Sequence, residues 1–460
     1  MINFKQSAFI LVLSTASAFA QNPITDNHLY AQVAGYKAAF TCSSTFNGGK
    51  SVEQINREDL AGIYPAYREA LEALPDAVIN HQEKYVTASY SDVMPPRIVV
   101  WREHLGCVQM PIGSTLDDSK HMPRINIEKP AEKNAPWPIG NKTEAFNNER
   151  LNKIIHDAFD SKTYGEGTYT TAVLVTTPDV MLGEEYRDGF NMRTSHRTWS
   201  VAKSIAATVI GAAVMENIVD VKEPANIAAW KRPGDPRGEI TLENLLNMTS
   251  GLHHNRAGNR TDDVYFGGAL MSDWSTGLSL EAKPGTRWKY ANNDTMLAIR
   301  SLRESIGDRD AYLKYPFEKV LYKIGMLDTK LETDWDGNFI MSSQVWTTAR
   351  DIGRLGILHL NKGMWQGERI IPENWTDYVS TPANVEPSRG AGYGAQWWLY
   401  PTSKFPDLQA DMYMANGNRG QRIMIIPDRD IVIIRRGHDD GTVASFDVVA
   451  FTRDVLDAVQ

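Results

Sequence analysis

Runs of apolar residues separated by turn-forming residues predict strands near both ends of the larger part of the chain. Residues Ala172–Val175 and Val180–Leu182 flank a Thr-Pro-Asp turn, which indicates a β-hairpin. Three later segments have the same character: Gln396–Tyr400, Ile423–Ile426 and Ile431–Ile434. A lone hairpin cannot bury its apolar face, so we expect the early and late strands to share one antiparallel sheet.

Between these strands, apolar residues recur with the spacing of amphipathic helices. A first helix is predicted from Ser200 to about Ile218, and a last one from Phe446 to about Val459. The intervening predicted helices are Leu242–Met248, Thr295–Ile306, Ala311–Ile324 and Thr348–Leu360. This order predicts an α+β fold in which helices flank the sheet and an α-rich subdomain interrupts it.

The first third of the chain has a less regular pattern. Helical periodicity runs through Val52–Leu74 with a break expected near Pro65, and Ile98–Trp101 has the character of a strand. Lys120–Asn148 contains four prolines among charged and amide residues and is the best candidate for a linker. We therefore expect an accessory region with this Pro-rich linker at residues 21–145, followed by the main domain at residues 146–460.

Residues 1–20 have the features of a secretory signal peptide. Lys5 lies in a short polar segment, an apolar stretch follows at Ala8–Leu13, and Ala18-Phe19-Ala20 precedes Gln21. Serine and threonine interrupt the stretch too often for a membrane anchor, and no later run is long and apolar enough to span a bilayer. We expect cleavage after Ala20 and a soluble, exported protein, periplasmic or secreted.

Composition and charge exclude several functions. The chain has 460 residues, 42% of them hydrophobic, which excludes disorder for most of its length. With 48 Lys and Arg against 56 Asp and Glu, the net charge is −8 and offers no basic surface for nucleic acid. The histidines include no H-E-x-x-H, and the adjacent His253 and His254 are interpreted as loop residues, so no metal site is predicted.

The two cysteines, Cys42 and Cys107, both lie in the accessory region. After export to an oxidising compartment they are expected to form a disulfide. Two buried thiols are the alternative. Two cysteines are too few for a Cys-rich zinc site.

Ser200 and Lys203 form the chain's S-x-x-K tetrapeptide, a pattern that this composition gives about once by chance. Its context is more specific, because it opens a helix that is apolar or small on every side. Residues three apart share a helical face, and burial would lower the pKa of Lys203 until it could deprotonate Ser200. The alternative is that Ser200 caps the helix while Lys203 extends to water.

Two further segments carry a family pattern in the expected order. Residues 240–252, ITLENLLNMTSGL, and residues 284–292, PGTRWKYAN, together with the S-x-x-K, resemble the serine β-lactamase and penicillin-binding-protein superfamily. The resemblance is strongest to the class C-like branch, with its esterases and 6-aminohexanoate-dimer hydrolases. It extends from about Thr168 to the C-terminus and implies a β-lactamase/transpeptidase-like fold. Residues 21–145 lie outside it.

The resemblance implies that Ser200 is the acylated nucleophile and Lys203 its base. Tyr290 and Asn292 match the Y-x-N motif. A phenol beside an ammonium is drawn toward phenolate and can pass a proton to the leaving group. The Asn292 amide can bond both Lys203 and a substrate carbonyl. The alternative for Tyr290 is a core aromatic residue next to Trp288.

The third motif of the family, usually K-T-G or H-x-G, is where this chain differs. The aligned residues are Ala415-Asn416-Gly417, without a cation. Gly417 allows a backbone N–H, that of Asn418, to approach a substrate carbonyl opposite the Ser200 N–H. Arg419 could replace the cation, although an exposed turn is favoured for it. His438, which follows a strand, is likewise expected in a solvated turn.

Three aromatic residues, Tyr393, Trp397 and Trp398, are candidates to line an acyl pocket. Strand alternation predicts that one tryptophan faces the core and the other does not. The absence of a G-x-S-x-G excludes the nucleophile elbow of α/β-hydrolases.

These observations predict an exported serine hydrolase that cleaves a small carboxylic ester or amide through a Ser200 acyl-enzyme, with no metal or cofactor. A D,D-peptidase or transpeptidase acting on peptidoglycan is the alternative among enzymes. A binding protein that kept the fold without turnover is the alternative outside them. The sequence leaves the oligomeric state open.

Overall fold

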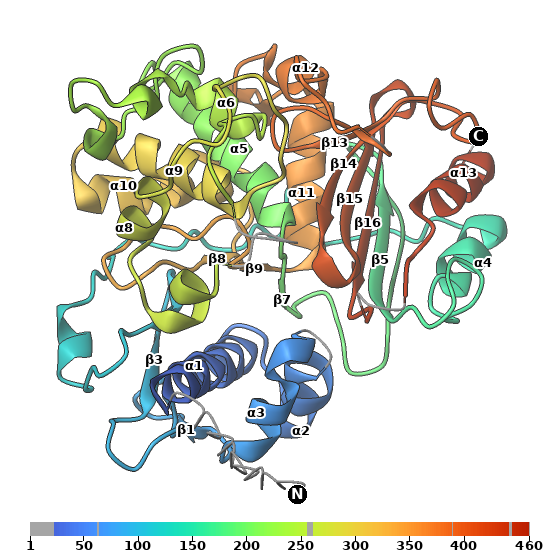
Figure 1. Ribbon diagram of the computed structural model, residues 1–460. Coiled ribbons are helices and arrows are strands. Elements are labelled where there is room, and N and C mark those ends of the chain that lie inside the picture. Colours follow the sequence, from blue (N-terminus) through green and yellow to red (C-terminus); the bar gives the residue numbers. More distant parts are fainter. Residues whose placement is uncertain (1–22, 62–63, 255–260, 389, 441–443, 460) are drawn as a thin grey trace, which may run out of the picture.

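The computed structural model describes residues 23–61, 64–254, 261–388, 390–440 and 444–459 (Figure 1). The expected signal peptide at residues 1–20 lies outside these residues. Among the helices that are described, none is both long and apolar enough to cross a membrane.

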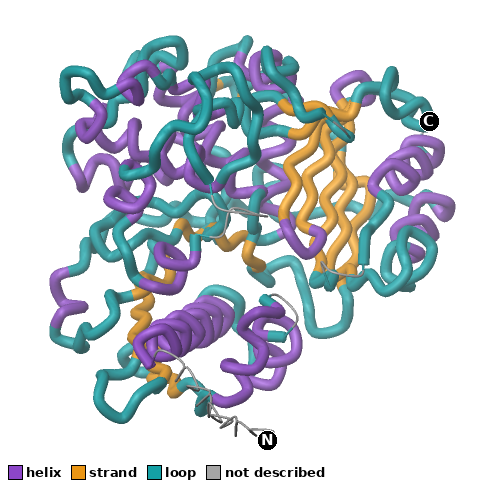
Figure 2. The backbone as a smooth tube through the Cα atoms, in the orientation of Figure 1, coloured by secondary structure: helices purple, strands orange, loops and turns teal. Residues whose placement is uncertain are grey.

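A seven-stranded antiparallel sheet joins the early and late strands, as predicted (Figure 2). Strand β5 pairs with β16 and places Val175 opposite Ile433. In spatial order the strands are β12 (Gly392–Tyr393), β13 (Trp398–Tyr400), β14 (Met412–Gly417), β15 (Gln421–Ile426), β16 (Ile431–Gly437), β5 (Thr170–Thr176) and β6 (Met181–Tyr186).

Helices cover both faces of this sheet (Figure 1). On one face, α5 (Val201–Met215) and α11 (Ala349–Leu360) share a core with Ile423 and Ile425. On the other face, α4 (Glu149–Asp157) and α13 (Val448–Ala458) pack with Met424 and Ile426. The alternation along β15 therefore separates the two cores.

The α-rich part lies between the early and late strands. Its helices are α6 (Leu242–Leu246), α8 (Met271–Thr276), α9 (Asn292–Ile306) and α10 (Arg309–Pro316), with π-helical turns η6 (Asp263–Gly267) and η7 (Phe317–Leu321). The helix predicted at Ala311–Ile324 is thus divided at Pro316, because proline lacks the N–H of a continuous helix. Smaller elements include η4 (Ala228–Trp230), η5 (Pro236–Glu239), α12 (Trp375–Ser380), the sheet of β7 (His196–Arg197), β9 (Val345–Thr347) and β8 (Lys330–Leu331), and the pair β10 (Met364–Trp365) and β11 (Glu368–Arg369).

The accessory region forms its own layer against the main domain (Figure 1). Helix α1 (Pro23–Phe46) packs on a four-stranded sheet of β1 (Val78–Asn80), β2 (Tyr85–Ala88), β3 (Arg97–Arg102) and β4 (Gly106–Gln109). Sequence periodicity did not predict α1, because nearly all of residues 31–45 are buried and no polar stripe marks them. The expected break at Pro65 is present between α2 (Val52–Ile55), η1 (Asn56–Leu60), η2 (Pro65–Tyr67) and α3 (Arg68–Ala73).

The expected disulfide is also present in this region. Cys42 of α1 and Cys107 of β4 are bonded, with their Cα atoms 6.2 Å apart. The bond ties the helix to the sheet that it covers.

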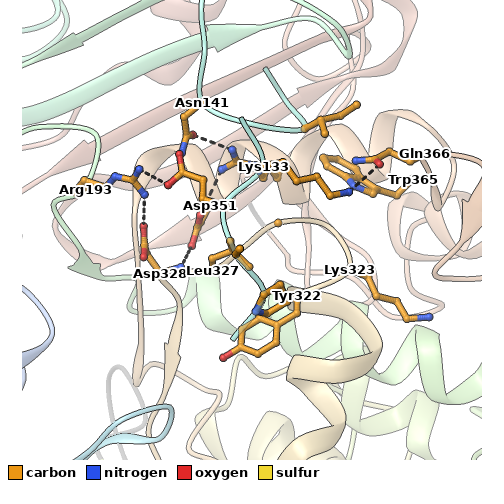
Figure 3. A pocket seen from close by; sticks show the side chains of 16 residues that line it. Lys133, Asn141, Arg193, Tyr322, Lys323, Leu327, Asp328, Asp351, Trp365 and Gln366 are labelled. Carbon is orange, nitrogen blue, oxygen red and sulfur yellow. Dashed lines mark hydrogen bonds and ion pairs between the residues drawn. The ribbon is translucent and has the colours of Figure 1, made fainter. Parts of the chain in front are cut away.

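The predicted linker is irregular but closely packed. Residues 122–148, all of them described, form no helix or strand, yet Trp137 is buried and lies under the Arg354 guanidinium, 4.8 Å from the ring centroid. Around this segment Lys133 binds Gln366, and Arg193 binds Asp328, beside a cavity of about 50 Å³ (Figure 3). The segment is therefore a strap fixed to the main domain.

Candidate active site

The nucleophile candidate lies at a sharp turn into α5. Trp199, the residue before it, adopts a left-handed backbone with φ of 50°, which is strained for a side-chain-bearing residue. The Ser200 side chain makes no capping hydrogen bond to the helix, which rules out the helix-cap alternative. The Ser200 hydroxyl instead contacts the side chains of Lys203 and Tyr290.

Lys203 is buried beside Ser200, with 1% of the residue exposed. Its Nζ donates to Ser200 Oγ at 3.3 Å, to Asn292 Oδ1 at 2.7 Å and to the Ser342 carbonyl at 2.6 Å. Burial lowers the pKa of Lys203 from 10.5 to about 7. The lysine does not extend to water, and a substantial fraction of it is neutral at neutral pH.

Tyr290 lies beside Ser200 and Lys203, but its ionisation differs from the expectation. Its hydroxyl forms a hydrogen bond with Ser200, and its ring centroid lies 5.0 Å from Lys203 Nζ. Burial raises the pKa of Tyr290 above its usual value. The expectation that the neighbouring ammonium draws the phenol toward phenolate is therefore wrong, because desolvation of the phenolate outweighs the other influences. Tyr290 is a neutral hydroxyl in the resting site.

Asn292 is the first residue of α9 and is buried, so its amide oxygen accepts from Lys203 as expected. Gly417 ends β14 close to the nucleophile. A Cβ atom at Gly417 would lie 2.3 Å from the Thr198 carbonyl oxygen and 3.3 Å from the Ser200 nitrogen. Asn418 follows directly at the surface. The structure thus brings the Gly417–Asn418 backbone against the start of α5, where glycine is required for the approach.

Residues 160–448, more than half of the chain, match the Beta-lactamase family. The chain belongs to this family. It is 24% identical over 303 residues to a 6-aminohexanoate-dimer hydrolase of Paenarthrobacter ureafaciens. The aligned residues cover 59% of this chain and 73% of that protein. The accessory layer at residues 23–121 lies outside the matched range.

Solved structures show the same fold. A putative 6-aminohexanoate-dimer hydrolase from Bacillus anthracis is similar with a TM-score of 0.53 and 21% identity, covering 69% of this chain and 85% of that one. A class C beta-lactamase in complex with cefoxitin has a TM-score of 0.51 and 13% identity, covering 67% and 98%. The resemblance inferred from the three motifs is confirmed, and so is the β-lactamase/transpeptidase-like fold. The chain is a serine hydrolase of the beta-lactamase family.

Two residues considered for the site make their contacts elsewhere. Arg419 is half-buried and donates to the carbonyls of His438, at 2.9 Å, and of Glu58 in the accessory region. His438 packs edge-on against His196, with ring centroids 5.2 Å apart, and its Nε2 lies 3.2 Å from Lys50 Nζ. The expected exposed turn at Arg419 and solvated turn at His438 are therefore wrong. Both residues lie where the accessory region covers the end of the sheet.

Sequence reasoning missed Ser342, which contacts Lys203, and Tyr265, which contacts Ser342. Ser342 accepts from Lys203 through its carbonyl, and its Oγ lies 2.5 Å from the Tyr265 hydroxyl. Tyr265 belongs to the π-helical turn η6, which packs on α1 of the accessory region. Neither residue lies in a motif, and both are brought to the site by long-range packing. Local sequence held no signal for them.

Aromatic residues form one wall beside Tyr290. Trp398 stacks on Tyr290 with ring centroids 5.6 Å apart, while Tyr393 meets both rings edge-on. Trp397 points the other way and is fully buried against His359. One tryptophan faces the core and the other does not, as predicted, but the strand begins only at Trp398 and not at Gln396. In the described part of the chain, no three His, Cys, Asp or Glu side chains gather in a way that could hold a metal ion.

Proposed function

We propose that the chain hydrolyses a carboxylic amide or ester through an acyl-enzyme on Ser200. The observation that carries the proposal is the buried Lys203, whose Nζ lies 3.3 Å from Ser200 Oγ and whose pKa is lowered to about 7. A lysine with this pKa is a general base near neutral pH, whereas an ordinary lysine is not. The 6-aminohexanoate-dimer hydrolase among the relatives supports an amide as the substrate class.

The proposed mechanism has the following order of steps. Neutral Lys203 accepts the Ser200 proton as Oγ attacks the substrate carbonyl carbon. The backbone N–H groups of Ser200 and Asn418 stabilise the oxyanion. The Tyr290 hydroxyl, kept neutral by burial, donates a proton to the leaving amine or alkoxide and is reprotonated from Lys203. Water then attacks the acyl-enzyme by the same path in reverse, and Ser200 regains its proton.

We further propose that the protein is exported after cleavage behind Ala20. The signal-like residues 1–20 and a disulfide in the accessory region are both typical of proteins in oxidising compartments. N-terminal sequencing of the protein recovered from a bacterial periplasm should begin at Gln21. Recovery of uncleaved chain from the cytoplasm alone would contradict export.

Labelling with a fluorophosphonate, read by intact mass, tests the nucleophile. The wild type should gain one adduct, and Ser200→Ala should gain none while it loses roughly 10³-fold or more of its amidase and esterase activity. Ser204→Ala is the matched control on the same helix, since the Ser204 hydroxyl donates to the Gln396 carbonyl, away from Lys203. An undiminished adduct on Ser200→Ala would refute the assignment.

A further inference from the structure

The turn that joins β14 to β15 has an unusual backbone. Arg419 adopts φ of 57° and ψ of 29°, in the left-handed region. For a residue with a side chain this conformation is strained, because the Cβ atom comes too close to the following carbonyl oxygen. Such a conformation persists only where surrounding contacts hold it, and such places are frequent at functional sites.

Arg422 donates to the Gly417 carbonyl at 2.6 Å and Gln421 to the Arg419 carbonyl at 3.2 Å, and the Arg419 side chain adds contacts that reach beyond the turn. Its guanidinium donates to three backbone carbonyls: to His438 at 2.9 Å, to Asp439 at 3.1 Å and to Glu58. Two of these carbonyls follow β16, and the third belongs to η1 of the accessory region. A planar guanidinium can reach several fixed acceptors at once, which the single ammonium of lysine cannot reproduce.

We call the contacts of Arg419 with these three carbonyls the clamp. The segment around Glu58, on the accessory side of the clamp, is held by contacts of its own. Asp59, next to Glu58, binds Lys50 at 2.7 Å, and the Lys50 side chain is 2% exposed. The Tyr36 hydroxyl of α1 donates to the Asp59 carbonyl at 3.0 Å. Glu58 therefore offers its carbonyl from a segment that is tied to Lys50 and to α1, the helix that also carries the disulfide.

The other side of the turn is the candidate active site. Gly417 lies against the backbone of Thr198 and Ser200, and the Asn418 side-chain oxygen accepts from the Arg419 N–H at 2.9 Å. The proposed oxyanion donor, the Asn418 N–H, thus lies between a residue that touches the nucleophile's backbone and a residue held by the accessory region.

We propose that Arg419 is a positioning residue that holds the Asn418 N–H in place by tying its turn to the accessory region. The accessory layer then acts on catalysis through Arg419, although it lies outside the family match. This inference rests on the proposed function, because it assigns a partner to that site's oxyanion donor. Arg419 itself touches no substrate.

Removal of the clamp should lower turnover more than substrate binding. Loss of an oxyanion donor costs about 10²–10³-fold in kcat, so a displaced donor should cost about 10–100-fold. Because the oxyanion forms only in the transition state, KM should change less than threefold.

The experiment compares Arg419→Met and Arg419→Lys with the wild type on p-nitrophenyl butyrate. Activity is expressed per active site, counted by labelling with fluorophosphonate to completion, so that misfolded protein does not contribute. A boronic acid forms a tetrahedral adduct on Ser200 that resembles the transition state. Its affinity for Arg419→Met should be lower than for the wild type by about the same factor as kcat/KM. Arg429→Met, at the exposed turn at the other end of β15, is the matched control and should behave as the wild type.

A lower kcat per site for Arg419→Met, a matching loss of boronate affinity and partial recovery in Arg419→Lys would support the inference. An unchanged kcat per site would overturn it, and so would a loss confined to KM. If Arg419→Met does not fold, Arg419→Lys alone decides by the same two criteria. Failure of the proposed function itself is distinguishable, because the wild type would then not form the Ser200 adduct.

Discussion

The pKa of Lys203 leads to a prediction about stability that is independent of any substrate. In the folded protein this pKa is about 7, whereas an unfolded lysine titrates near 10.5. Between these values the unfolded chain binds a proton that the folded chain does not. The free energy of unfolding should therefore rise with pH, by about 1.4 kcal/mol per pH unit from this group.

The perturbation is Lys203→Met, which removes the titrating group and keeps an unbranched side chain. The contribution of Lys203 is most unfavourable below pH 7 and disappears above pH 10.5. From pH 7.5 to pH 9.5 the wild type should thus gain about 2–3 kcal/mol relative to the variant. The constant cost of leaving the Asn292 and Ser342 oxygens without their donor cancels in this comparison.

Urea unfolding followed by tryptophan fluorescence measures both proteins at several pH values with the disulfide intact. The assay reads the difference between the two unfolding free energies, not either value alone. Parallel pH dependences would refute a lowered lysine pKa. The same pKa predicts that kcat/KM of the wild type rises tenfold per pH unit below about pH 7, since only neutral Lys203 can act as base. A flat profile from about pH 5 to 9 would require another base.

Three further predictions concern the site and the accessory region. Replacing Lys203 or Tyr290 should each strongly lower the reactivity of Ser200, and the double variant should lose less than the sum of the two, because the proposed mechanism gives both residues one proton path. The rate at which the fluorophosphonate phosphonylates Ser200 measures this. Hydrolysis of p-nitrophenyl butyrate should exceed that of nitrocefin, because Ala415–Gly417 supply no cation for a substrate carboxylate and the Arg419 guanidinium is bound to carbonyls. The missing charge-assisted hydrogen bond is worth about 1.5–3 kcal/mol. A higher kcat/KM for nitrocefin would contradict this prediction. Peptide mapping without reduction should recover the peptides joined by the Cys42–Cys107 disulfide. Removal of this disulfide should lower the free energy of unfolding by about 4 kcal/mol in the chain-entropy model. Two alkylatable thiols in the native protein would contradict the disulfide.

Local pattern was a good guide to the elements of the main domain. The strands at Ala172–Val175 and Ile431–Ile434 and the helix after Ser200 appear where the sequence predicts them. Each is a nearly unbroken run of apolar or small residues, a signal carried by residues close together in the chain. Helix α1 was missed because polar residues such as Gln32, Lys37 and Ser44 interrupt its buried surface without forming a polar stripe.

The sequence by itself determined the proximity of Ser200 and Lys203, since one helical turn places them together whatever surrounds them. Only the tertiary structure decided their ionisation and that of Tyr290. Desolvation depends on which distant segments cover a side chain, and here these include Asn292, Ser342 and the aromatic wall. The same reason explains why Arg419 is not in the exposed turn that the sequence predicts. Its turn is exposed by local pattern, but the Glu58 carbonyl that binds it lies 361 residues earlier in the chain, and no local pattern records such a contact.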